Sequence, residues 1–216
     1  MIKEKTIAII PIKSNSERVK KKNFRLLTGV PLYEHFLNKL TNSSFDEIYV
    51  DTDSEEVCKF IENTDFIYIP RLPELAKSNA NGNDLLNYHA SIIDADYYFQ
   101  LFITSPLLKI ETINEAIKIL KKENKYDSIF TANKIYSWIW YQNKPVNYDP
   151  KTLPRSQDAV PIIRETTGLY GITKEVLLKN KCRIGSKPYM LFVDDYEAVD
   201  LDTEFDFKYL EFLMKK

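Results

Sequence analysis

Positively charged side chains crowd the polar stretch that follows the first apolar run of the chain. That run covers residues 7–10 and ends at Pro11. The segment after it carries five cations, Lys13, Arg18, Lys20, Lys21 and Lys22. A basic loop at the end of a buried strand can hold a polyphosphate, because its charges neutralise the phosphate oxygens. Charge runs also occur on solvated surface loops, so this stretch by itself leaves both interpretations open.

Two carboxylates near the end of the chain, Asp200 and Asp202, are separated by a single apolar residue. On an extended segment, side chains two residues apart point to the same side. Two hard oxygen ligands in this arrangement suit a Mg²⁺ ion that also binds substrate phosphates. The structural alternative is helix capping, in which Asp202 or Thr203 begins the last helix. Both can hold together, because capping leaves Asp200 without a role.

The basic loop and the carboxylate pair together predict phosphoryl or nucleotidyl transfer. Such reactions need cations on a polyphosphate and a metal ion that offsets developing charge, and they need little covalent help from the protein. Lys13, Arg18 and Lys22 are the candidate catalytic cations. The two histidines, His35 and His89, fall within predicted helices, where packing or surface roles are expected. Neither GxxxxGK[ST] nor GxGxxG occurs, which disfavours a P-loop nucleotidase or a standard Rossmann dehydrogenase.

Strand and helix patterns alternate along the chain and must position these residues. Strands are predicted at 7–10, 46–52, 66–69, 97–103, 127–132, 169–172 and 189–193, and helices at 31–40, 53–61, 84–93, 110–122, 174–178 and 204–214. This order predicts an α/β fold with a mainly parallel sheet. Ligands of such sheets bind outside the carboxyl ends of the strands. The rule places the basic loop, residues 51–53, and Thr104 with Ser105 along one rim.

The alternation breaks at residues 134–164. This segment is rich in aromatic side chains, namely Tyr136, Trp138, Trp140, Tyr141 and Tyr148. A structureless loop of this length inside a compact domain is improbable. We therefore predict an inserted flap, hairpin or dimer arm at about 134–164, within a single domain that covers residues 1–216.

Composition bears on partners and location. Lysine and arginine number 30 against 31 aspartates and glutamates, so the overall charge indicates neither nucleic acid nor an anionic membrane as a partner. No segment approaches the roughly 20 apolar residues of a membrane span, and the N-terminus lacks a secretory signal. Cys58 and Cys182 are far apart and are expected to be free thiols. We expect a cytoplasmic protein.

The order of these pieces resembles the CMP-sialic acid synthetase (acylneuraminate cytidylyltransferase) family over nearly the whole chain. That family opens with a strand and a pattern close to AR-x-x-S-K-x-x-x-x-KN, which residues 12–23 (IKSNSERVKKKN) resemble. Lys13 stands where the family has its triphosphate arginine, and Ser16, Lys22 and Asn23 match directly. Four further stretches are similar to V-S-T-D, RPxELA, PTSPLR and D-x-D-T-E, namely VDTD (50–53), RLPELA (71–76), TSPL (104–107) and DLDTE (200–204).

The resemblance implies a three-layer α/β/α nucleotidyltransferase fold, Rossmann-like, with a small inserted dimerisation or flap element. It implies CTP as substrate, magnesium as cofactor with Asp200 and Asp202 as ligands, and a homodimer built largely by the insert. Arg71 is the arginine that the family uses to hold the cytosine. The nucleotide-binding residues that it implies are Lys13, Ser16, Lys22, Asn23, Arg71, Asn79 and Asn81.

The chain departs from the family pattern on the acceptor side. Phe102 stands where the family has a glutamine (LLQPTSPL), Leu108 replaces the arginine after Pro-Leu, and residues 165–168 (ETTG) replace R-x-N-G. The resemblance therefore supports CTP and magnesium more strongly than it supports sialic acid itself. The candidate acceptor-binding residues are Thr104, Ser105, Arg155, Gln157 and Arg164, because arginine suits bidentate recognition of a carboxylate.

These observations predict a CTP-dependent cytidylyltransferase that acts on an acidic acceptor, a nonulosonic or sialic-type acid sugar, for surface polysaccharide or glycoconjugate synthesis. One alternative keeps the chemistry and replaces the sugar by a small phosphate, phosphonate or other acid. A second alternative is a nucleotide-binding relative that has lost catalysis, which the retention of both Asp200 and Asp202 disfavours.

Overall fold

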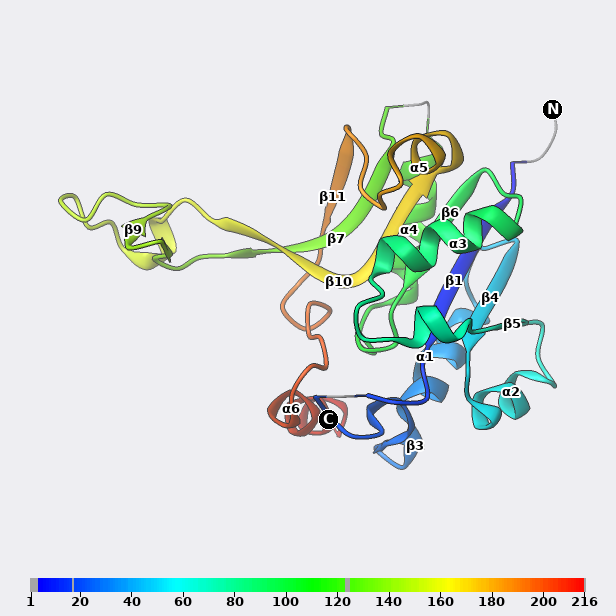
Figure 1. The fold of residues 1–216 in the computed structure, drawn as a ribbon. Coiled ribbons are helices and arrows are strands. Elements are labelled where there is room, and N and C mark those ends of the chain that lie inside the picture. The colour runs from blue at the N-terminus through cyan, green and yellow to red at the C-terminus, as the bar shows by residue number, and fades with distance from the viewer. Residues whose placement is uncertain (1–3, 17, 123–124, 216) are drawn as a thin grey trace.

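The computed structural model describes residues 4–16, 18–122 and 125–215, and Glu17 of the basic loop lies outside them. Its centre is a seven-stranded sheet in the order β11-β7-β10-β6-β1-β4-β5 (Figure 1). The strands are β1 (Thr6–Ile12), β4 (Glu47–Thr52), β5 (Ile67–Pro70), β6 (Tyr97–Leu101), β7 (Ser128–Ile135), β10 (Ile162–Thr173) and β11 (Pro188–Phe192). All run in one direction except β10, which pairs antiparallel with both β6 and β7.

Helices cover both faces of the sheet. They are α1 (Leu32–Leu40), α2 (Glu55–Ile61), α3 (Gly82–Ile92), α4 (Ile110–Lys121) and α5 (Lys174–Asn180). The last helix, α6 (Glu204–Met214), lies away from the sheet and packs in a separate cluster with Leu27 and Leu32 (Figure 1). Short 3-10 turns are η1 (Lys22–Phe24), η2 (Pro73–Ala76) and η3 (Ser156–Asp158). Two small ribbons pair β2 (Leu26–Leu27) with β3 (Val30–Pro31) and β8 (Trp140–Tyr141) with β9 (Lys144–Pro145). None of the helices in the described ranges is both long and apolar enough to cross a membrane.

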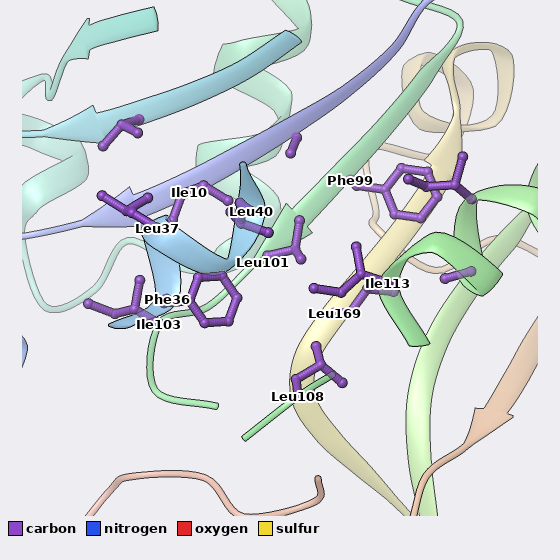
Figure 2. Packing of buried hydrophobic residues seen from close by; sticks show 14 of the residues in the cluster. Ile10, Phe36, Leu37, Leu40, Phe99, Leu101, Ile103, Leu108, Ile113 and Leu169 are labelled. Atoms are coloured by element: carbon purple, nitrogen blue, oxygen red, sulfur yellow. The ribbon is translucent and has the colours of Figure 1, made fainter. Parts of the chain in front are cut away.

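Alternation along β1 explains the two helical layers. Ala8, Ile10 and Ile12 pack in the cluster that holds the apolar faces of α1, α2 and α4 (Figure 2). Ile7 and Ile9 belong to a second cluster with residues of α3 and α5. Successive side chains of a strand point to opposite faces, so a strand that is apolar at every position must be covered on both. The predicted three-layer α/β/α fold with a mainly parallel sheet is confirmed.

Several boundaries differ from the sequence-based expectation. β10 begins at Ile162 rather than at 169, because its first residues pair with β7 beyond the main body of the sheet. Pro31 precedes α1 with extended backbone (φ −54°, ψ 143°) and does not occupy the first helical position. The β2–β3 ribbon was absent from the prediction, since two-residue strands carry no periodic pattern.

The segment between β7 and β10, residues 136–161, projects away from the sheet, and we call it the arm (Figure 1). The side chain of Asn147 organises it. The Asn147 amide donates to the carbonyls of Ser137 and Val160, both at 2.7 Å, and its Oδ1 accepts from Ile139 N at 2.9 Å. These bonds join both legs of the arm and add to the short backbone ladder between β8 and β9.

Candidate active site

The basic loop begins where β1 ends and is held in shape by side chains. Asn23 donates from Nδ2 to the Lys13 carbonyl at 2.8 Å. Asp53, directly after β4, accepts from Ser14 N at 2.6 Å and from Ser14 Oγ at 2.8 Å. Lys21 adopts a left-handed backbone (φ 51°) that turns the chain into η1. The loop is therefore a built structure with fixed anchors.

A cavity of about 420 Å³ opens between this loop and the segment that leads into α3. The predicted residues that line it are Lys13, Ser16, Arg18, Lys22, Asn23, Arg71, Asn81 and Thr104. They come from the ends of β1, β5 and β6 and from the N-cap of α3, as the rule for parallel sheets requires. Asn81 caps α3 by accepting from Asn83 N at 2.8 Å, which fixes its side chain at the helix start.

The C-terminal segment reaches the basic loop from the other end of the chain. Leu201 N donates to the Thr104 carbonyl at 2.8 Å, and Lys22 Nζ donates to the Leu201 carbonyl at 2.8 Å. Arg18 bonds to both carboxylate oxygens of Asp202, each at 2.7 Å. Arg25 bonds to Glu204 at 2.7 Å and lies over the Phe207 ring. Asp200 and Asp202 are thereby held beside the predicted phosphate-binding cations.

Burial shifts the ionisation of the groups at this junction. Desolvation raises the pKa of Asp200, the nearby charge of Asp202 raises it further, and the hydroxyls of Thr104 and Thr167 partly offset both. Desolvation also lowers the pKa of Lys22, although Asp202 and Asp200 oppose this shift. A half-buried carboxylate pair of this kind is costly to keep charged unless a further cation reaches it.

The surroundings of Asp200 and Asp202 are compatible with a bound magnesium ion. Oδ1 of Asp200 is buried and accepts no hydrogen bond from the residues that the structure describes. Among those residues, no group of three or more His, Cys, Asp or Glu forms a metal cluster. A site of two carboxylates matches the way proteins hold Mg²⁺, which keeps several waters and takes its remaining ligands from substrate phosphates. Asp200 and Asp202 would hold the ion.

The N-terminus of α6 is capped by residues other than Asp200 and Asp202. Thr203 is the N-cap of α6, and its side chain and Asp206 form a capping box. Asp202 bonds to Arg18 through its side chain and donates its backbone N–H to Asp206. The structural alternative for this stretch therefore applies to Thr203 and Asp206, and it leaves the side chains of Asp200 and Asp202 for another purpose.

A second cavity of about 510 Å³ includes both Asp200 and Asp202 in its wall, and Arg18 and Lys22 of the first cavity contact Asp202. Arg164 is its one cation among the described lining residues, and Arg164 Nε donates to Asn133 Oδ1 at 3.0 Å. A bulge in β10 between Glu165 and Tyr170 shapes this wall. Within the bulge Thr167 has positive φ (41°). Bulges next to active sites re-aim side chains in this way.

Four predicted site residues do not line either cavity within this chain. Asn79 lies in the loop before α3 and lines neither cavity, and the Ser105 side chain is buried. Arg155 and Gln157 belong to the arm, where Arg155 pairs with Asp158 at 2.6 Å. Arg155 and Arg164 are close in the sequence, but β10 begins between them at Ile162. Arg164 therefore lies in the sheet, whereas Arg155 lies on the arm.

Some lining residues were missed. In the first cavity these include Lys77, Ser78, Gly82 and Phe102, and in the second they include Asp195, Phe205 and Tyr209. Lys77 and Ser78 adjoin the predicted Asn79, so their position after the RLPELA stretch was a usable signal. Phe205 and Tyr209 lie one turn apart on α6, where an exposed aromatic pair gave no indication of a cavity.

Comparisons with known proteins identify the family and the fold. Residues 7–207 match the family model described as cytidylyltransferase. The chain is 28% identical to CMP-N,N'-diacetyllegionaminic acid synthase of Legionella pneumophila over 97% of this chain and 96% of that protein. It is 26% identical to N-acylneuraminate cytidylyltransferase A of Danio rerio and 29% identical to N-acylneuraminate cytidylyltransferase of Streptococcus agalactiae, over 94% of this chain in both cases. The chain spans about half the length of these two relatives, 49% and 52%.

The fold has close counterparts among solved structures. CMP:2-keto-3-deoxy-manno-octonic acid synthetase, in complex with CTP, superposes with a TM-score of 0.72 at 16% identity and 98% coverage of both chains. A 4-diphosphocytidyl-2C-methyl-D-erythritol synthase from Anaerococcus prevotii gives a TM-score of 0.69 at 14% identity, covering 98% of this chain and 97% of that one. With a family model that spans nearly all of the sequence, this chain belongs to the cytidylyltransferase family.

Proposed function

We propose that this protein transfers CMP from CTP to an acidic acceptor, an acid sugar of the nonulosonic type, and releases pyrophosphate. The observation that carries the proposal is the junction at Asp200 and Asp202. One cavity is walled by Lys13, Arg18 and Lys22, and the other by Arg164 and the pair itself. A triphosphate and an acceptor bound in these two cavities would meet at the carboxylate pair.

The proposed reaction is an in-line substitution at the α-phosphorus of CTP. An acceptor hydroxyl oxygen forms the new bond to phosphorus, and the bond from phosphorus to the oxygen that bridges to the β-phosphate breaks. Pyrophosphate leaves with that electron pair, and the hydroxyl proton is released. Lys13, Arg18 and Lys22 would offset the negative charge that grows on the leaving group. Ser16 would donate a hydrogen bond to the phosphates, while Asn23 supports the loop through Lys13.

Magnesium held by Asp200 and Asp202 would add positive charge at the phosphate oxygens. The carboxylates themselves have a second effect that depends on this chain alone. Asp202 already organises Arg18 and lies 3.6 Å from Lys22 Nζ, so it gathers the cations at the place where the phosphates would lie.

The acceptor class is supported by the names of the relatives and by one side chain, Arg164. The other described charged residues of the second cavity are five carboxylates, Glu165, Asp195, Asp200, Asp202 and Asp206. The names of the relatives given above refer to acylneuraminic and legionaminic acids. The name of the structural neighbour refers to an octonic acid. Arg164 could pair with the carboxylate of such a sugar, since a guanidinium offers two parallel donors. A CMP-linked acid sugar would be a precursor for surface polysaccharide or glycoconjugate.

The arm supports a homodimer as part of the same proposal. Its exposed apolar side chains include Trp140 at 56%, Tyr141 at 67% and Val160 at 68% exposure. Large apolar surfaces of this kind mark protein contacts. A second copy would also offer Arg155 and Gln157 to a neighbouring cavity. The proposal includes a cytoplasmic location and no nucleic-acid or membrane partner.

Pyrophosphate release tests the proposal directly. The protein is incubated with CTP, Mg²⁺ and a panel of acidic sugars, small phosphates and phosphonates. Release is expected with at least one acid sugar, and Asp202→Asn should lower it by about 100-fold or more. Asp65→Asn is the matched control, because Asp65 is exposed and lines neither cavity.

Other outcomes separate the alternatives. Turnover confined to a small phosphate or phosphonate would overturn the acceptor class and keep cytidylyl transfer. A CTP-induced rise in melting temperature without turnover on any acceptor would indicate a nucleotide-binding protein that lacks catalysis. Neither turnover nor a CTP-induced shift would overturn the whole assignment.

A further inference from the structure

Three ionisable side chains meet beneath the first cavity, and none of the steps above uses their contacts with one another. Asp51 lies in β4, Arg71 directly follows β5, and His89 lies on α3. Asp51 is 1% exposed, Arg71 8% and His89 0%. Sequence order placed residues 51–53 on an open rim, but Asp51 is enclosed by the arginine and the histidine. Only Asp53 reaches the basic loop.

Asp51 holds the Arg71 guanidinium at two nitrogens. Arg71 Nε bonds to Asp51 Oδ1 at 2.5 Å, and Nη2 donates to the backbone carbonyl of Asp51 at 3.0 Å. A planar group bonded at two corners to one residue cannot rotate about its long axis. The third nitrogen, Nη1, has no hydrogen bond to the described residues, and Arg71 lines the cavity.

His89 closes the other side of the carboxylate. Its Nε2 is 2.9 Å from Asp51 Oδ2, although the ring is turned so that neither ring nitrogen has a well-directed hydrogen bond to described residues. The carboxylate is thus held between a guanidinium and an imidazole. Asp51 has little room to move away from Arg71, because both neighbours are buried and packed.

Stability alone is a weak reason for this cluster. Removing an ion pair from water costs about as much as its attraction returns, and apolar replacements are often equally stable. What the pair does provide is orientation, since arginine carries donors and no acceptor. A guanidinium with a fixed plane presents donors in one direction only.

The base of CTP is the ligand on which a fixed donor would act. The ring edge of cytosine offers two neighbouring acceptors, O2 and N3, whereas uracil has an N–H donor at N3. A donor held in place forms a hydrogen bond with the acceptors of cytosine, whereas it faces the N3–H donor of uracil and is repelled. A guanidinium that could turn would find the carbonyl oxygens of uracil instead. Sites that leave a buried polar group unpaired reject an analogue strongly.

We propose that Asp51, backed by His89, is a positioning residue that orients Arg71 to select cytosine over uracil. This inference rests on the proposed function, because it takes the cavity to be the nucleotide site.

The test compares binding of CTP and UTP, each with Mg²⁺, by calorimetry. Wild-type protein should prefer CTP, and Asp51→Asn and Asp51→Ala should reduce that preference by about 10-fold. Arg71→Lys should do the same although it keeps the charge, because an ammonium cannot make both bonds to Asp51. Arg71→Lys changes the base contact itself, so it does not decide the role of Asp51. If the Asp51 variants fail to fold, His89→Phe decides the matter, because it leaves Arg71 in place, removes the group that backs Asp51 and should also reduce the preference for CTP.

Two controls make the result specific. Asp53→Asn removes the anchor of Ser14 in the basic loop, so it should weaken CTP and UTP equally and leave their ratio unchanged. In an Arg71→Ala background, Asp51→Asn should change the ratio no further, since Asp51 acts through Arg71.

The outcomes separate the two proposals. If wild-type protein binds CTP selectively and the Asp51 variants keep that selectivity, the positioning role is overturned and the proposed function stands. If wild-type protein binds neither nucleotide, the proposed function fails and the positioning role fails with it.

Discussion

Arg18 and Asp202 lie 184 residues apart in the chain and form a two-point ion pair. Nη1 bonds to Oδ2 and Nη2 to Oδ1, both at 2.7 Å. Asp202 is also a proposed ligand of magnesium, so a bound ion would compete with Arg18 for the same oxygens. Loss of this ion pair would free Arg18 to contact the triphosphate.

Arg18→Ala tests this competition. The variant should bind Mg²⁺ about 3-fold or more tightly in the absence of nucleotide, because Asp202 is released, and should bind CTP about 10-fold more weakly. Its free energy of unfolding should change by less than about 1 kcal/mol, since the Arg18 side chain is 68% exposed. Calorimetric titration with MgCl₂ and then with CTP measures both. Lys20→Ala is the control, and weaker Mg²⁺ binding by Arg18→Ala would contradict the competition.

Asp200→Asn should separate stability from ligand binding. Burial and Asp202 raise the pKa of Asp200, and its Oδ1 lacks a partner, so the charged group costs stability while no metal is bound. The amide should therefore raise the free energy of unfolding in EDTA by about 1 kcal/mol. It should also lose the stabilisation that Mg²⁺ and CTP together give the wild-type protein. Thermal melts in EDTA and in MgCl₂ with CTP check both, and a less stable variant in EDTA would count against this account.

Lys39 predicts a pH dependence of stability. This helix α1 residue donates to the carbonyls of Pro106 and Leu108 at 2.5 and 2.6 Å, and burial lowers its pKa from 10.5 to about 8. Between those values the unfolded chain holds more protons than the folded one, so the contribution of Lys39 to stability rises with pH. Relative to Lys39→Met, the free energy of unfolding of the wild-type protein should rise by about 1 kcal/mol between pH 7 and 9.

Urea unfolding of both proteins at each pH measures the difference and cancels groups that they share. Lys118→Met supplies the comparison, because Lys118 is an exposed residue of α4 and should show no such trend. A constant difference between wild-type protein and Lys39→Met across this range would show that Lys39 titrates normally.

The arm should control the oligomeric state. Tyr141→Arg places a charge on a side chain that is 67% exposed at the β8–β9 ribbon, so it should disrupt a dimer without unfolding the sheet. Multi-angle light scattering after gel filtration reads the mass. Tyr68→Arg on β5 is the control, since Tyr68 is 47% exposed but lies at the opposite edge of the sheet from the arm. A monomeric wild-type protein would dismiss the dimer.

The order of strands and helices followed from sequence because periodicity is local. The run at 7–10 is apolar at every position and became a strand covered on both faces, and the pattern at 204–214 became α6 with the same bounds. The basic loop and the carboxylate pair were also visible, since both are clusters of one residue type. What sequence reasoning lacked was the reversed direction of β10, which depends on its pairing with β6 and β7.

The amino-acid sequence by itself determined the elements, the family pattern and the types of side chain available for chemistry. Tertiary structure decided which of them meet. Arg18 reaches Asp202 across the whole chain, Asp51 is buried against Arg71 and His89, and Arg155 stays on the arm while Arg164 returns to the sheet. The reason is physical: spacing sets which face a side chain occupies, whereas burial and partners depend on neighbours that strand order brings together.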